Sequence, residues 1–215
     1  MLKVAPSILS ADFAYLARDV EMVEKAGAEY LHIDVMDGQF VPNMSFAAPV
    51  IKCIRPHSKM VFDVHLMIVE PKRYLDDFVK AGADIITVHA EATDDLRGTL
   101  EQIKESGVKV GLSIKPKTEP EEIREYLPLC DLVLVMSVEP GFGGQSFMPD
   151  SLRKLRILRE MREEMGLSYE LEVDGGIGLQ NAGQVREAGA EVVVAGSSVF
   201  GADDPAEAIR GLMSC

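Results

Sequence analysis

The stretch Ala26–Gly38, AGAEYLHIDVMDG, joins the end of an expected helix to a buried strand. Glycine after alanine is a common helix end, and the apolar run Tyr30–Val35 has the composition of a strand. This strand carries His32 and Asp34 two residues apart. Because strand side chains alternate between faces, both point the same way. A polar pair inside an otherwise buried strand indicates a site.

The same unit of strand, helix and glycine stop recurs along the chain. Further helix ends read AGA, SGV and AGA at Ala81–Ala83, Ser106–Val108 and Ala188–Ala190. The expected strands are Lys3–Ile8, Tyr30–Val35, Met60–Leu66, Asp84–His89, Lys109–Ile114, Leu132–Met136, Glu170–Val173 and Glu191–Ala195. The expected helices are Asp12–Ala26, Ala47–Ile54, Pro71–Ala81, Asp94–Ser106, Pro120–Leu127, Met148–Met165, Leu179–Glu187 and Pro205–Leu212.

Eight such units in 215 residues predict an α/β fold of the (β/α)8 TIM-barrel type. An open doubly wound sheet would need a break in strand order, of which the pattern gives no sign. No linker or low-complexity stretch divides the chain. We therefore expect a single barrel domain over residues 1–215.

Composition narrows the class of protein. The formal net charge of −13 argues against a nucleic-acid or membrane-surface partner, which favours basic patches. No apolar run has the length of a membrane span, and the N-terminus lacks the apolar segment of a signal peptide. Cys53, Cys130 and Cys215 are widely spaced, without a CxxC motif. These features predict a cytoplasmic protein with reduced thiols, and the acidic balance does not exclude an anionic substrate at a local site.

Polar side chains gather at the carboxyl ends of the expected strands, where TIM barrels hold their active sites. On the third strand Asp63, His65 and Met67 share one face, and the seventh strand runs into Asp174. One buried histidine or aspartate is more often structural, but a group at one mouth favours a single divalent transition-metal ion. The candidate ligands are His32, Asp34, His65 and Asp174. His89 is expected to play a structural role and His57 to lie in a solvated loop.

Glycine-rich loops follow the last three strands. They are Glu139–Gln145, Gly175-Gly176 and Gly196-Ser197-Ser198. Because glycine lets backbone N–H groups approach an anion, and such barrels bind phosphate after strands seven and eight, these loops predict a phosphate site. Methionines stand at three strand ends, either as core filler or as a dry wall over a reacting centre. These are Met36, Met67 and Met136.

Five stretches together resemble the signatures of the ribulose-phosphate 3-epimerase family. They are SILSADF (Ser7–Phe13), HIDVMDGQFVPN (His32–Asn43), DVHLMIVEP (Asp63–Pro71), MSVEPGFGGQSF (Met136–Phe147) and EVDGGI (Glu172–Ile177). The resemblance runs from Ala5 to about Phe200. It implies a ribulose-phosphate-binding barrel that interconverts D-ribulose 5-phosphate and D-xylulose 5-phosphate in the pentose phosphate pathway, as a homo-oligomer.

The resemblance also implies roles for particular residues. Asp34 and Asp174 would be the acid/base pair, working through an enediolate with one carboxylate on each face of C3. His32, Asp34, His65 and Asp174 would bind one ion of zinc, iron, manganese or cobalt, which stabilises the developing negative charge. Ser7 and His65 would contact the substrate. Further substrate contacts would be Gly141, Phe142, Gly143, Gly144, Gly175, Gly176, Gly196 and Ser197, with Met36, Met67 and Met136 lining the reacting centre.

Other functions are compatible with parts of this pattern. An epimerase for D-allulose 6-phosphate would use the same acid/base pair. A decarboxylating lyase of the superfamily would carry Asp-x-Lys-x-x-Asp, but Asp34–Asp37 contains no lysine. A non-catalytic sugar-phosphate binder would not need two carboxylates and two histidines. The sequence leaves open the metal, the oligomeric state, the length of the sugar, the direction in which each aspartate acts and whether the loop Gly141–Phe147 closes as a lid.

Overall fold

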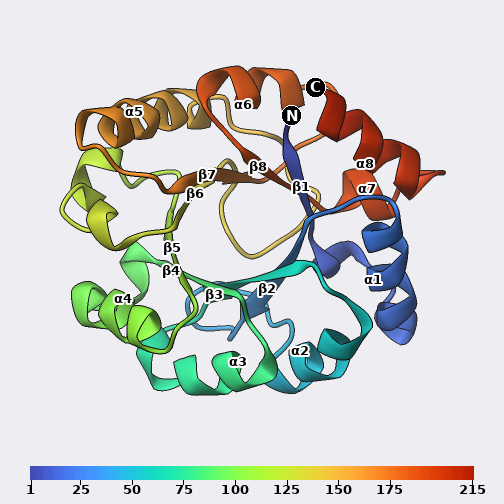
Figure 1. Cartoon of the computed structure of the whole chain (residues 1–215), viewed down its shortest axis with the longest axis horizontal. Coiled ribbons are helices and arrows are strands. Elements are labelled where there is room, and N and C mark those ends of the chain that lie inside the picture. Colours follow the sequence, from blue (N-terminus) through green and yellow to red (C-terminus); the bar gives the residue numbers. More distant parts are fainter.

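The computed structural model describes all 215 residues as a ring of parallel strands surrounded by helices (Figure 1). The strands bond in the order β1-β8-β7-β6-β5-β4-β3-β2, and a parallel bridge between Ser7 and His32 brings β2 back to β1. The predicted TIM barrel is confirmed. The strands are β1 (Lys3–Pro6), β2 (Tyr30–Met36), β3 (Val61–Met67), β4 (Ile85–His89), β5 (Lys109–Ile114), β6 (Leu132–Met136), β7 (Glu170–Asp174) and β8 (Val192–Ala195).

The helices lie outside this ring (Figure 1). They are α1 (Leu16–Lys25), α2 (Ala48–Ile54), α3 (Leu75–Ala81), α4 (Leu96–Glu105), α5 (Ser151–Glu164), α6 (Ala182–Ala188), α7 (Ser197–Phe200) and α8 (Pro205–Ser214). Two glycine stops illustrate why they end where they do. Gly82 follows α3 with φ +102° and Gly189 follows α6 with φ +121°, a region that L side chains rarely adopt. None of the helices combines the length and the apolar character needed to cross a membrane.

One expected helix is wrong, and one short helix was not among those expected. The segment expected as a helix over Pro120–Leu127 forms two 3₁₀ turns, Pro120–Ile123 and Leu127–Leu129. Pro128 lies within the second turn, where it has no N–H to donate and disfavours α-helical backbone at Leu127, so the two turns do not join as one α-helix. The four-residue α7 after β8 was not expected, because so short a helix shows no periodicity.

The inside of the barrel is divided between apolar and polar side chains. Outward faces of the strands pack on the helices in a cluster of 50 buried apolar residues. Inward positions of β1, β6 and β8 are also apolar, among them Ala5, Leu134 and Val194. Most inward positions of β2, β3, β4 and β7 are instead polar, namely His32, Asp34, Asp63, His65, Thr87, His89, Glu172 and Asp174. Since TIM-barrel interiors are normally filled by branched apolar residues, the polar half marks a functional region.

A hydrogen-bonded group ties strands together at the opposite end of the barrel. The Tyr30 hydroxyl donates to Glu170 at 2.6 Å, and Lys3 pairs with the same carboxylate. These residues begin β2, β7 and β1.

Candidate active site

A cavity of about 300 Å³ opens at the carboxyl ends of the strands. Its wall includes Ser7, both candidate acid/base residues and the three strand-end methionines. All eight residues predicted in the glycine-rich loops line it as well: Gly141, Phe142, Gly143, Gly144, Gly175, Gly176, Gly196 and Ser197. His32 and His65 are fully buried and are not among the lining residues. The substrate contact expected for His65 stays a prediction.

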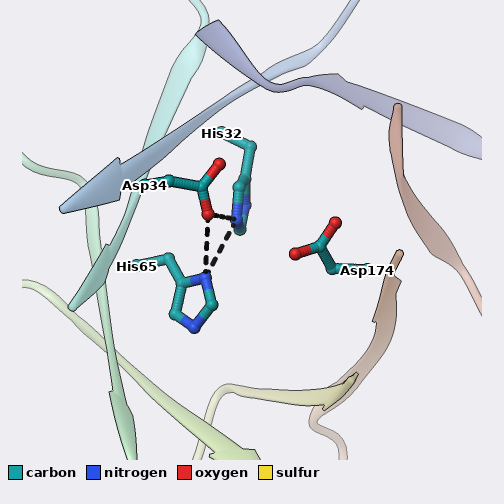
Figure 2. A group of neighbouring side chains, drawn as sticks. All are labelled: His32, Asp34, His65 and Asp174. Atoms are coloured by element: carbon teal, nitrogen blue, oxygen red, sulfur yellow. Dashed lines mark hydrogen bonds and ion pairs between the residues drawn. The ribbon is translucent and has the colours of Figure 1, made fainter. Parts of the chain in front are cut away.

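The four predicted ligands converge on one point beside the cavity (Figure 2). Nε2 of His32 lies 3.3 Å from Asp34 Oδ1 and 3.2 Å from His65 Nδ1. Asp174 approaches from β7, across the barrel from the other three (Figure 2). One donor atom from each residue lies within 4.8 Å of all the others. Two imidazole nitrogens and two carboxylate oxygens at this spacing can hold one divalent transition-metal ion.

The ring of His32 is oriented for such an ion by the side chain behind it. Its Nδ1 lies 2.6 Å from Asp63 Oδ2, and the other Asp63 oxygen accepts from the Thr87 hydroxyl at 2.9 Å. Because a carboxylate accepts, Nδ1 carries a proton, and with an ion bound Nε2 would turn its lone pair to the centre. Metal-binding histidines usually have a support of this kind.

The ring of His65 is backed by a second imidazole. Its Nε2 lies 2.8 Å from Nε2 of His89, which leaves Nδ1 facing Asp34 at 3.2 Å. Burial lowers the pKa of His89 to about 4. The expected structural role of His89 therefore fits its position, whereas His57 lies at the surface beside Glu21, 3.1 Å away.

The site carries more negative than positive charge. Burial opposes protonation of His32, but Asp34 and Asp63 outweigh it and raise the pKa of His32 well above its ordinary value. Glu172 is fully buried with no hydrogen-bond partner for either oxygen, and burial followed by the Asp63 charge raises the pKa of Glu172. A cation is the simplest compensation for so many buried carboxylates.

The two candidate acid/base residues differ in their environments. Burial would raise the pKa of Asp34, yet His32 and His65 hold that pKa far below its ordinary value. The Ser7 hydroxyl also donates to Asp34 Oδ2 at 2.5 Å. Burial and then the Asp34 charge raise the pKa of Asp174 to about 6. Carboxyl groups whose pKa values are pushed apart are suited to opposite roles in proton transfer, and a bound cation would favour the ionised form of both.

Sequence reasoning missed several residues of the site. Glu172 shares the inward face of β7 with Asp174, so the alternation that revealed Asp34 beside His32 could have revealed it. Four further polar side chains line the cavity without having been predicted as contacts: Ser10, Gln145, Gln180 and Ser198. Ser10, Gln145 and Ser198 belong to motifs or loops already named from the sequence, whereas Gln180 lies outside them.

Comparison of structures places the fold among known barrels. KGPDC from Streptococcus mutans superposes with a TM-score of 0.73 at 13% identity, covering 100% of this chain and 96% of that one. A 3-hexulose-6-phosphate synthase gives a TM-score of 0.68 at 22% identity, covering 99% and 98%. At these identities the likeness concerns the fold alone.

Sequence comparison is more specific. The model of the ribulose-phosphate 3 epimerase family matches residues 3–200. A ribulose-phosphate 3-epimerase from Synechocystis is 54% identical over 97% of this chain and 92% of its own. One from Bacillus subtilis is 50% identical over 97% of both chains. This chain therefore belongs to the ribulose-phosphate 3-epimerase family.

Proposed function

We propose that this chain is a metal-dependent enzyme that interconverts D-ribulose 5-phosphate and D-xylulose 5-phosphate by inverting C3. The observation that carries the proposal is the placement of Asp34 and Asp174 on opposite sides of one cavity (Figure 2). Membership of the family and its relatives at about 50% identity support the same substrate.

Inversion at C3 needs a proton to leave one face of the carbon and another to arrive on the opposite face. C3 is next to a carbonyl, so its deprotonation gives an enediolate. One aspartate takes the proton and the other delivers one, and the roles exchange when the reaction runs backwards. The Ser7 hydroxyl orients Asp34 through Oδ2, while Oδ1 faces the two histidines.

His32, Asp34, His65 and Asp174 would hold the ion. When bound, it supplies stabilisation of the negative charge that develops on the sugar oxygens. Zinc, iron, manganese and cobalt all accept this mixture of nitrogen and oxygen ligands. The orientation of the His32 ring, with Nδ1 held by Asp63 and Nε2 facing the other ligands, is the clearest sign that the residues fit such an ion.

Three methionines close the reacting centre. Met36, Met67 and Met136 are at most 5% exposed and come from adjacent or facing strands. Their thioethers carry no exchangeable proton and exclude water, so they do not compete with the aspartates for the proton. We assign them this role in place of simple core filling.

The glycine loops are proposed to bind the phosphate of the substrate. Substitution of Gly176 by alanine tests this proposal. Gly176 has φ +64°, and an added Cβ would lie 2.6 Å from Phe147 N and 2.7 Å from Gln145 O. Since backbone atoms cannot swing aside, Gly176→Ala must displace the loop after β6. We expect a rise in KM for the sugar phosphate and a loss of stability beyond the roughly 1–3 kcal/mol of the left-handed backbone alone.

Gly166→Ala is the matched control for that change. Gly166 also has φ +64°, but nothing lies within 4 Å of its added Cβ. It should carry the conformational cost only and leave KM unchanged. Urea unfolding and steady-state kinetics compare the two variants. Equal losses of stability with an unchanged KM in both would contradict a phosphate-binding role for the Gly176 loop.

The substrate is tested by comparing two sugars. The metal-loaded protein should convert D-ribulose 5-phosphate with a kcat/KM at least about 10-fold above that for D-allulose 6-phosphate, since a pocket fitted to one chain length discriminates by about this much against one more carbon. NMR of the product measures both. A preference for the six-carbon sugar would reject the pentulose assignment, and turnover of neither would reject epimerisation.

We further propose that residues 1–215 form one catalytic domain that assembles with copies of itself in the cytoplasm. Phe13, Tyr15 and Met44 are between 56% and 76% exposed near the mouth of the barrel, and such apolar side chains favour association. All three cysteines are free thiols, which suits a reducing compartment. Light scattering on the purified protein should give a mass of at least twice 23.5 kDa, whereas a mass of one chain would contradict self-association.

A further inference from the structure

We propose that Glu91 is a positioning residue for this site. Acting through His89, it fixes His65 in the ring form whose Nδ1 lone pair is free to bind the ion. The inference rests on the proposed function, because it concerns the same ligands. It adds Glu91, a residue that does not line the cavity and contacts none of the four candidate metal ligands.

The argument begins with the contact between two histidines. Nε2 of His65 and Nε2 of His89 are 2.8 Å apart, a hydrogen-bond distance at which one proton must lie between them. Either His65 donates and keeps its lone pair on Nδ1, or His89 donates and His65 carries its proton on Nδ1. Only the first arrangement makes His65 a ligand.

The local surroundings of His65 do not settle this choice. Asp34 Oδ1 lies 3.2 Å from His65 Nδ1 and would accept a proton from it, whereas His32 Nε2, also 3.2 Å from that nitrogen, can donate to it. Because these two neighbours act in opposite directions, a group on the far side, at Nδ1 of His89, can set the direction of the pair. The charged group there is Glu91, whose Oε2 lies 3.3 Å from that nitrogen.

A carboxylate at this place can only accept. Burial opposes ionisation of Glu91, but its contacts with His89, Thr118 and the Lys115 N–H lower its pKa to about 2. It therefore favours a proton on Nδ1 of His89. A neutral imidazole has one proton, so Nε2 of His89 then accepts from His65. Glu91 Oε2 and His89 Nδ1 are at ion-pair distance but are not aligned as a hydrogen bond, so Glu91 acts on the Nδ1 proton of His89 through its charge.

The carboxylate is held in place by the loop after β5. Its Oε1 accepts from the Lys115 N–H at 2.9 Å and from the Thr118 hydroxyl. That loop is in turn braced by Lys154, a lysine only 1% exposed, whose ammonium donates to the carbonyls of Pro116 and Thr118 at 2.6 Å each. With Oε1 committed to these donors, Oε2 is the atom left for His89.

The two histidine ligands are thus supported differently. His32 has a carboxylate in direct contact, Asp63 at 2.6 Å. His65 has an imidazole in that place, which can donate as easily as accept. Glu91 supplies the carboxylate acceptor that His65 lacks, but acts through His89. This explains why a partly exposed glutamate is held by two hydrogen bonds from the loop after β5.

The test uses Glu91→Gln, which keeps the shape of the side chain. The Lys115 N–H demands an oxygen at the Oε1 position, so the new amide must turn its NH₂ group toward His89. Nδ1 of His89 becomes an acceptor, its proton moves to Nε2, and the whole pair reverses. We expect cobalt affinity of the variant, measured by competition with a chelator, to fall by about 10- to 100-fold.

Glu91→Ala distinguishes this from a general structural effect. It removes the acceptor without installing a donor, so it should weaken cobalt binding less than Glu91→Gln does. A purely structural role predicts the opposite order, because glutamine fills the space and alanine does not. Glu170→Gln is the matched control, since the two glutamate side chains are 24% and 25% exposed and Glu170 contacts only Lys3 and Tyr30 at the other end of the barrel. It should leave cobalt affinity unchanged.

Nitrogen-15 NMR of the metal-free protein gives a readout independent of activity. The wild-type His89 should be protonated on Nδ1 and the Glu91→Gln variant on Nε2. Unchanged protonation together with unchanged cobalt affinity would overturn the proposal, as would a greater loss for Glu91→Ala than for Glu91→Gln. Failure of the proposed function would be seen separately, as a wild-type protein that binds cobalt but does not epimerise the sugar.

Discussion

Replacing Asp174 by asparagine is expected to abolish epimerisation while leaving hydrogen exchange at C3 of one epimer. Asparagine cannot carry a proton to or from carbon, so one face of C3 loses its acid/base group. Asp34 remains on the other face and can still remove and return a proton there. General acid–base groups contribute about 10²–10⁴-fold, so epimerisation should fall by at least that range.

The measurement is NMR of each epimer in heavy water with the Asp174→Asn protein. Deuterium should enter C3 of one epimer with no formation of the other. Asp34→Asn should likewise abolish epimerisation, and any remaining exchange should appear in the opposite epimer, because Asp174 serves the other face of C3. Asp131→Asn is a control at the opposite end of the barrel, where Asp131 accepts from the Val110 N–H at 2.8 Å. Near-normal epimerisation by Asp174→Asn would reject the two-carboxylate mechanism.

Removing the metal should have a comparably large effect. Without a cation, Asp34 and Asp174 repel each other and nothing offsets charge on the sugar oxygens. We expect turnover to fall by at least about 10³-fold after chelation, the size of loss seen when a main electrostatic stabiliser is removed. Zinc, iron, manganese or cobalt should restore it, whereas magnesium and calcium should not, because two of the four ligands are imidazoles.

Metal removal should also lower the thermal stability. An ion that binds only the folded chain stabilises it by about 2.7 kcal/mol at 100 times its dissociation constant. Elemental analysis and calorimetry on the same samples check both effects. Full activity in protein shown to be metal-free would contradict the metal-dependent account.

Local periodicity was enough to predict the barrel and the inward faces of the candidate ligands on the second and third strands. The alternation of His32 with Asp34, and of Asp63 with His65, placed all four on inward faces, and the structure has them there. The repeated glycine stops located the helix ends because a positive φ is a local requirement, as at Gly82 and Gly189.

What escaped prediction depends on contacts between distant segments. Glu91 and Lys115, whose N–H it accepts, are 24 residues apart in the sequence. No local pattern in either stretch predicts that the two meet. The two 3₁₀ turns near Pro128 carry the apolar spacing of a helix, and the missing N–H decides against one. Glu172 could have been found by alternation, but its isolation from any donor depends on the packing of the whole barrel.

The most direct test of the central claim is the position of the label after a single turnover. Metal-loaded protein is mixed with D-ribulose 5-phosphate in heavy water, and C3 is followed by NMR at early times. Two carboxylates on opposite faces predict that the first D-xylulose 5-phosphate formed carries deuterium at C3, while unreacted substrate keeps its proton, because the delivering aspartate has exchanged with solvent. Product that retains the original proton would show that one group serves both faces and would contradict the account.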